Sequence, residues 1–186
     1  MPGVVLLAFA LGIYQAYIAL AASLCVVLMI KELLSGSDAG AVLRRGLVLL
    51  VLLAAALGIY YLVTLIVESA VGSGYQEYEV TASAGFGRSL AAAYSSFIGI
   101  FLSGNFGFVS SGVSMAAHIV CALAAAYAIV SCAIRMKDVR RAVLLAVLLA
   151  LYPLSVNCMY LIASADIIHS LVMFSFVSFY VLTAVA

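Results

Sequence analysis

The chain has 186 residues, of which 68% are hydrophobic and only 8% are charged, and its mean hydropathy is +1.34. A soluble domain is about half apolar and about a quarter charged, so this composition excludes a water-soluble globular fold. The formal net charge is +1, and there is no basic tract that would bind nucleic acid. Apolar runs of about twenty residues recur, and each is long enough to cross the hydrocarbon core of a bilayer. We therefore predict an all-α fold, a polytopic membrane helix bundle.

The apolar runs predict about five transmembrane spans in one transmembrane domain. In chain order the spans cover residues 4–30, 46–67, 109–134, 139–162 and 167–186. The first run has no charge before Lys31 and is long enough for a full span, so we interpret it as a retained helix and not as a signal peptide. Only the letters ASAD separate the last two spans, which predicts a tight helical hairpin.

The basic residues predict how the bundle is oriented. Between the first two spans and between the third and fourth spans lie Lys31, Arg44, Arg45, Arg135, Lys137, Arg140 and Arg141. Only Arg88 lies in the remaining loops. The positive-inside rule assigns the seven residues to the cytoplasm, which predicts an outside N-terminus and a cytoplasmic C-terminus.

One sizeable loop, residues 68–108, is predicted on the outside. Its second part has apolar side chains at helical spacing on one face, while Arg88 and several serines fall largely on the other face. This pattern predicts a helix over about 86–102 that lies in the outer membrane interface. A short re-entrant or core helix is the alternative.

Three polar side chains interrupt the apolar sequence of the last two spans: Asn157, Asp166 and His169. Such groups are costly at membrane depth and usually face protein or water. Asp166, at the predicted outer turn, either caps the fifth span or acts together with His169, three residues later on the same face. His169 is either a structural group or an acid/base or phosphate ligand. Asn157, with Tyr160 one turn further, either joins helices or lines a substrate cleft.

A second polar cluster, Tyr14, Gln15 and Tyr17, lies in the first span. With an outside N-terminus, this cluster occupies a depth comparable to that of Asn157 and His169. Polar groups from three helices in one layer predict a polar cavity that opens outward, because packing rarely needs so many. Polar contacts that only join helices are the alternative.

We predict no metal site and no cofactor. The four cysteines stand inside apolar runs without CxxC or Cys/His spacing, which indicates buried thiols. Phosphate-binding glycine loops, HExxH and GxSxG are absent from the sequence. If the chain is an enzyme, its donor has to be presented within the membrane, for example as a lipid-linked group.

Two segments, IYQAYIALAASLCVVLMIKELL at 13–34 and LYPLSVNCMYLIASADIIHSLVMFSFV at 151–177, resemble the bacterial type II Gtr glucosyltransferases. The first is similar to that family's Tyr-Gln-containing span, which a cytoplasmic turn follows. The second is similar to a pattern of Pro and Asn, an apolar-Tyr step, a short outside turn, and His before Leu and Met. The matching residues are Pro153, Asn157, Tyr160, His169, Leu171 and Met173.

The resemblance implies a glycosyltransferase of the bacterial inner membrane. Such an enzyme moves a sugar, here glucose, from polyprenyl-phosphate at the outer face to a cell-surface polysaccharide such as O-antigen. Its partners would be membrane lipid, the lipid-linked donor and an envelope glycan acceptor. The family's acidic catalytic loop after the first span is absent here, so we expect the later portion of such an enzyme or a truncated relative.

The resemblance and the polar layer together define the predicted site. Arg88 is expected near the lipid phosphate, which it would pair with, or it snorkels to headgroups. The predicted substrate-binding residues are Tyr14, Gln15, Tyr17, Arg88, Asn157, Tyr160 and His169. Asp166 and His169 are the candidate catalytic residues.

Two other functions stay open on the sequence. One is a non-catalytic multi-pass protein that serves as a scaffold or accessory subunit. The other is a transporter or flippase component in which Asp166 and His169 relay protons, although such proteins place their charges near the membrane midplane.

Overall fold

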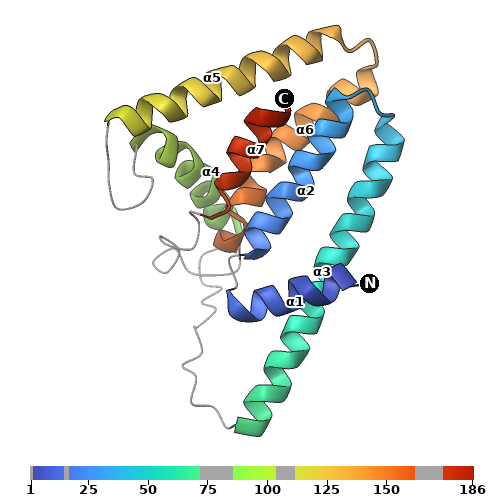
Figure 1. The fold of residues 1–186 in the computed structure, drawn as a ribbon, viewed down its shortest axis with the longest axis vertical. Coiled ribbons are helices and arrows are strands. Elements are labelled where there is room, and N and C mark those ends of the chain that lie inside the picture. Colours follow the sequence, from blue (N-terminus) through green and yellow to red (C-terminus); the bar gives the residue numbers. More distant parts are fainter. Residues whose placement is uncertain (1, 15–16, 72–85, 104–111, 162–173) are drawn as a thin grey trace.

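The computed structural model describes residues 2–14, 17–71, 86–103, 112–161 and 174–186, and among them it contains helices and no strand. The helices are α1 (Pro2–Ile13), α2 (Tyr17–Leu34), α3 (Ala39–Val71), α4 (Phe86–Ser103), α5 (Gly112–Arg135), α6 (Val139–Val156), the short 3-10 helix η1 (Cys158–Leu161) and α7 (Val177–Val185). The predicted all-α helix bundle is thus confirmed (Figure 1).

Four of the described helices are long and apolar enough to cross a membrane. They cover Tyr17–Leu34, Ala39–Ala70, Met115–Arg135 and Val139–Val156. Only 6% of the apolar window of α3 is buried inside the protein, so most of its surface faces outward. So much exposed apolar surface is not stable in water. Exposed surface of this kind marks contact with lipid or with another protein. The chain is a membrane protein.

The first apolar run, expected as one helix over 4–30, is divided into α1 and α2. The helical hydrogen bonding of α1 ends at Tyr14, and the N–H of Tyr17 donates to the Tyr14 carbonyl over 3.1 Å. Before the break, α1 crosses α3 at a steep angle. After the break, α2 continues into the bundle (Figure 1). Two features favour the break: Gly12 is a poor helix former within one turn of it, and Leu11 is buried against the rest of the protein.

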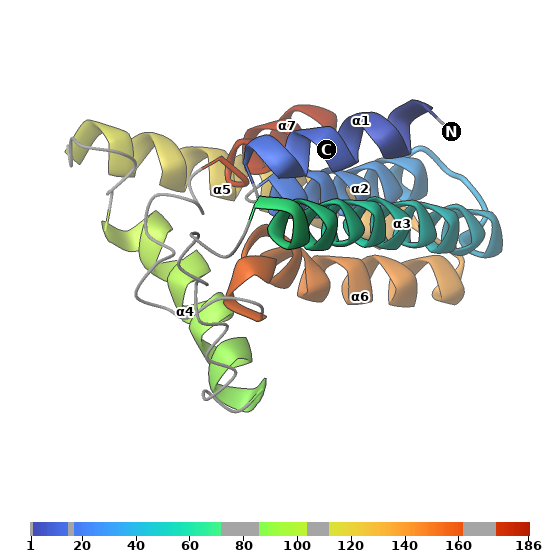
Figure 2. The ribbon, with the colours of Figure 1, turned by 90° about the horizontal axis from the view of Figure 1, so that it is seen from below.

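The core of the bundle lies around α2, which has α6 on one side and α7 on the other (Figure 2). The buried apolar side chains of these three helices are Ile18, Ala19, Val27, Ile30, Leu33, Leu145, Leu148, Tyr152, Val156, Phe179 and Leu182. Those of α6 recur every three or four residues, which places them on one helical face. The same periodicity explains why α6 contributes a single stripe to the core.

Helix α4 occupies the range in which the sequence predicts an amphipathic helix. It projects sideways from the other helices (Figure 2). One face of α4 contacts α6 and η1, with Ala93 fully buried there. Its location in the outer membrane interface stays a prediction.

The fourth and fifth predicted spans differ from the described helices in extent. The expected range 139–162 contains α6, which ends at Val156, and then η1. Pro153 lies in the last turn of α6, where it removes one backbone donor. The expected range 167–186 contains α7, and its first seven residues lie outside the described part of the chain.

Candidate functional site

Seven of the eight basic residues lie at one end of the bundle, and the described residues of the predicted polar layer lie at the other end. Helices α2 and α6 each have 18 residues and run in opposite directions. At 1.5 Å per residue each is about 27 Å long, which is close to the thickness of a bilayer core. The α2–α3 and α5–α6 turns form what we call the basic end. The start of α2, the end of α6, η1 and the start of α7 form the polar end.

Asn157 is fully buried at the polar end, where α6 gives way to η1. Its Nδ2 donates a hydrogen bond of 2.7 Å to the backbone carbonyl of Ala93 on α4. Its Oδ1 is also buried and has no hydrogen-bond partner among the described residues. Buried polar atoms are nearly always paired in proteins. The contact between α6 and α4 therefore accounts for the hydrogen bond of the Asn157 nitrogen. The oxygen is left as an acceptor for another group.

Two tyrosines complete a polar seam between α4 and the α6–η1 segment. The hydroxyl of Tyr160 donates to Ser96 Oγ over 3.1 Å, and the hydroxyl of Tyr94 donates to the carbonyl of Ala150 over 2.6 Å. Ala150 stands one turn before Pro153. The three α4 residues of the seam, Ala93, Tyr94 and Ser96, span barely one helical turn.

Aromatic contacts connect the break between α1 and α2 with this seam. The rings of Tyr14 and Tyr17 meet edge to face at 5.6 Å, and Tyr14 meets Phe174 in the same way at 5.9 Å. Two residues later, the buried Phe176 stacks on Phe97 of α4 with ring centroids 5.5 Å apart. The start of α7 thus brings the tyrosine pair and the seam to the same end of the bundle.

The predicted site residues divide into two groups. Tyr14, Tyr17, Asn157 and Tyr160 are brought together at the polar end, whereas Arg88 is exposed near the start of α4 and forms no ion pair with the described residues. Gln15, Asp166 and His169 lie outside the described residues.

The chemistry available in the described part of the polar end is hydrogen bonding and ring contact. Phenol hydroxyls, a serine hydroxyl and an amide can bind sugar hydroxyls, and aromatic walls with a few polar groups are typical of small-molecule sites. No group of His, Cys, Asp or Glu side chains able to hold a metal occurs among the described residues. A general base would have to come from the part of the chain that carries Asp166 and His169.

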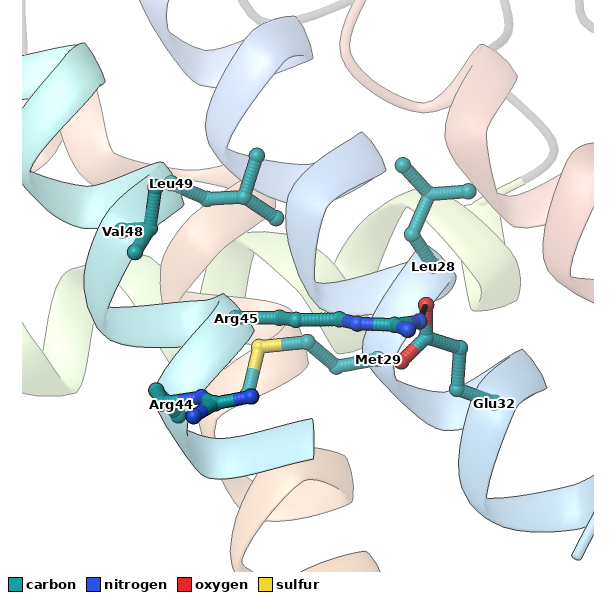
Figure 3. A pocket seen from close by; sticks show the side chains of 7 residues that line it. All are labelled: Leu28, Met29, Glu32, Arg44, Arg45, Val48 and Leu49. Atoms are coloured by element: carbon teal, nitrogen blue, oxygen red, sulfur yellow. Dashed lines mark hydrogen bonds and ion pairs between the residues drawn. The ribbon is translucent and has the colours of Figure 1, made fainter. Parts of the chain in front are cut away.

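The basic residues between the first two spans predict the orientation, but their spacing does not predict the ion pair that Arg45 forms with Glu32. A cavity of about 400 Å³ lies between α2 and α3, and its lining is Leu28, Met29, Glu32, Arg44, Arg45, Val48 and Leu49 (Figure 3). Arg45 reaches across it, with Nη1 2.6 Å from Oε1 of Glu32. The residues stand thirteen positions apart on two helices, so no periodic pattern signals the pair.

Four membrane-capable helices with hydrogen-bonding residues gathered at one end define a polytopic membrane protein with a candidate ligand site at that end of the bundle. Residues 1–185 match the family described as Glucosyl transferase GtrII, and the chain belongs to this family. The predicted resemblance to the type II Gtr glucosyltransferases is thereby confirmed. No curated protein and no solved structure matches the chain.

Proposed function

We propose that this chain acts as a glucosyltransferase, or as part of one, at the outer face of the bacterial inner membrane. The donor is glucose linked to polyprenyl-phosphate, and the acceptor is a cell-surface polysaccharide such as O-antigen. In this arrangement the polar end faces outward and the basic end faces the cytoplasm. The chain enters α2 from the outside, and α7 runs from the polar end toward the basic end.

The observation that carries the proposal is the separation of the two ends. Seven of the eight basic residues lie in or near the two turns of the basic end, and Arg141 of α6 donates to the Leu33 carbonyl of α2 over 2.6 Å. By the positive-inside rule this end favours the cytoplasm. A sugar site at the opposite end then has to use a donor that is present outside, and a lipid-linked sugar meets that need.

The proposed site combines the described polar end with residues that flank it. Tyr14, Tyr17, Asn157 and Tyr160 would bind sugar hydroxyls, with Asn157 Oδ1 as a buried acceptor. Gln15 directly follows Tyr14 in the chain. The described residues Leu161 and Phe174 both lie at the polar end, and they flank the stretch of sequence that carries Asp166 and His169.

The reaction balances with these groups. A hydroxyl oxygen of the acceptor attacks the anomeric carbon of glucose, and the bond from that carbon to the phosphate oxygen breaks. Polyprenyl-phosphate leaves with the electron pair, and Arg88 would stabilise its charge. The proton of the acceptor hydroxyl passes to His169 or Asp166 as general base.

The test is transfer of radiolabelled glucose from polyprenyl-phosphate to the acceptor glycan in membranes that contain the protein. His169→Ala should lower the rate about 100-fold or more, since a general base contributes at least that much. Tyr127→Phe is a control, because Tyr127 is exposed on α5, away from the polar end. Transfer at the wild-type rate in both His169→Ala and Asn157→Ala, with normal membrane insertion, would contradict the proposed site.

A further inference from the structure

A second cavity lies at the basic end, where the end of α2 meets the α5–α6 turn. It has a volume of about 380 Å³, and its lining is Leu34, Cys132, Arg135, Met136, Lys137 and Arg141. Half of these side chains are basic and the others are apolar or weakly polar. We call it the basic cavity.

The backbone around the basic cavity is fixed by a hydrogen bond between its two sides. Arg141 Nη2 donates to the carbonyl of Leu33, in the last turn of α2, over 2.6 Å. The Leu33 carbonyl also accepts from the Gly36 N–H over 3.1 Å, and a cation at this end of the helix interacts favourably with the helix dipole. Gly36 has φ of +98°, a conformation that glycine adopts without strain, and this lets the chain turn directly after α2.

Arg141 retains hydrogen-bonding capacity beyond that bond. It is half-buried, and its Nε is buried without a hydrogen-bond partner among the described residues. A guanidinium has five N–H donors, and buried donors are nearly always paired. Arg141 thus lines the basic cavity with an N–H donor that the described residues do not satisfy.

The charge of the basic cavity is not balanced by the described carboxylates. Among the described residues the only ion pair is Arg45 with Glu32, which lies in the neighbouring cavity of Figure 3. Asp138 is the acid nearest in sequence, and it caps α6, with Oδ1 accepting from the Arg140 N–H over 2.9 Å. Arg135 and Lys137 are exposed, so two mobile cations and one anchored cation face the same space.

We propose that the basic cavity binds the phosphate of an anionic phospholipid headgroup. Three cations fit a phosphate, and basic pockets between transmembrane helices at the cytoplasmic side bind such headgroups. The apolar part of the lining favours a lipid over a soluble phosphate. Ile134 and Val139, which flank the turn, are 80% and 74% exposed, so the cavity opens beside an apolar surface suited to acyl chains. This site is separate from glucosyl transfer and does not depend on it.

The experiment measures thermal stabilisation of the purified 186-residue chain in phosphatidylcholine micelles. Phosphatidylglycerol is titrated in, and inorganic phosphate at the same concentration is titrated separately. We expect stabilisation by phosphatidylglycerol and none by inorganic phosphate. Each basic residue near the membrane surface contributes about a factor of five to the affinity for an anionic lipid. In Arg135→Gln/Lys137→Gln the apparent affinity for phosphatidylglycerol should therefore fall about 30-fold.

The matched control is Lys31→Gln/Arg140→Gln. It removes two exposed cations from the same end of the protein, outside the lining of the basic cavity. A loss of less than about threefold in this control would support a specific site, since a diffuse field depends on the total charge. Equal losses in both double variants would overturn the proposal, and equal stabilisation by inorganic phosphate would overturn the assignment to a lipid. Arg141 is left unchanged because its bond to Leu33 supports the fold.

Discussion

Asn157 divides its hydrogen bonding between structure and an open acceptor. The nitrogen joins α6 to α4, whereas the oxygen is buried without a described partner. An amide can serve both purposes because its donor and acceptor are separate atoms. A sugar hydroxyl bound at Oδ1 would therefore be held by a side chain that packing already keeps rigid.

Asn157→Ala should lower the free energy of unfolding by about 1–1.5 kcal/mol, because it removes the buried 2.7 Å hydrogen bond to the Ala93 carbonyl. Tyr160→Phe should cost less, about 0.5–1 kcal/mol, since the bond from Tyr160 to Ser96 is longer and only part-buried. Denaturant unfolding in detergent measures both values. If Asn157→Ala lowered the free energy of unfolding by less than Tyr160→Phe does, the amide would not be the main contributor to the stability of the seam.

Residue-level reasoning could identify Asn157 as a polar group that needs a partner, but it could not identify the partner. That partner is the backbone carbonyl of Ala93, 64 positions away. Every residue has a backbone carbonyl, so the sequence does not indicate which one accepts the bond. The same holds for Tyr94, whose hydroxyl donates to the Ala150 carbonyl, 56 positions away. Tyr14 and Tyr17, one turn apart, were expected to lie together, and their rings are in contact.

At the scale of elements, apolar periodicity predicts which segments form helices better than where they bend. The amphipathic pattern at 86–102 corresponds to α4, Phe86–Ser103. The first apolar run is divided into α1 and α2, and no proline in the sequence marks the position of the division. The division depends on how α1 lies across α3. Tertiary contact of this kind overrides local helix propensity, so a single apolar run gives no sign of it.

The seam should control how firmly α4 is attached to the bundle. Tyr94→Phe removes the 2.6 Å bond to Ala150 and keeps the ring. We expect amide hydrogen exchange in α4 to rise about fivefold, which corresponds to the loss of about 1 kcal/mol, with little change in α2. Tyr61→Phe, exposed on α3, is the control. Unchanged exchange in α4 would show that apolar contacts alone hold this helix.

At the scale of the whole molecule, the dominant feature is the amount of apolar surface left outside the core. Helix α3 has 33 residues and is about 50 Å long, more than the roughly 30 Å of a bilayer core, so it has to tilt or extend beyond it. Helix α5 also exposes large side chains along its length, including Leu123 and Tyr127. Such faces mark contact with lipid or with further protein, and the buried core extends beyond α2, α6 and α7 only to a few side chains: Leu11 of α1, Val42 and Ala56 of α3, Ile129 of α5, Met159 of η1 and Phe176.

The proposed orientation predicts which end reacts with a reagent that cannot cross the membrane. In a background with the four cysteines replaced by alanine, Ser35→Cys reports the basic end and Gly87→Cys reports the start of α4. Both positions are exposed, and a Cβ at Gly87 would meet nothing within 4 Å. A charged maleimide should label Gly87→Cys in intact spheroplasts and Ser35→Cys only in inverted vesicles, because the basic turns favour the cytoplasm. The reverse pattern would place the polar end in the cytoplasm. A lipid-linked donor would then no longer be required, because nucleotide-linked sugars are available there.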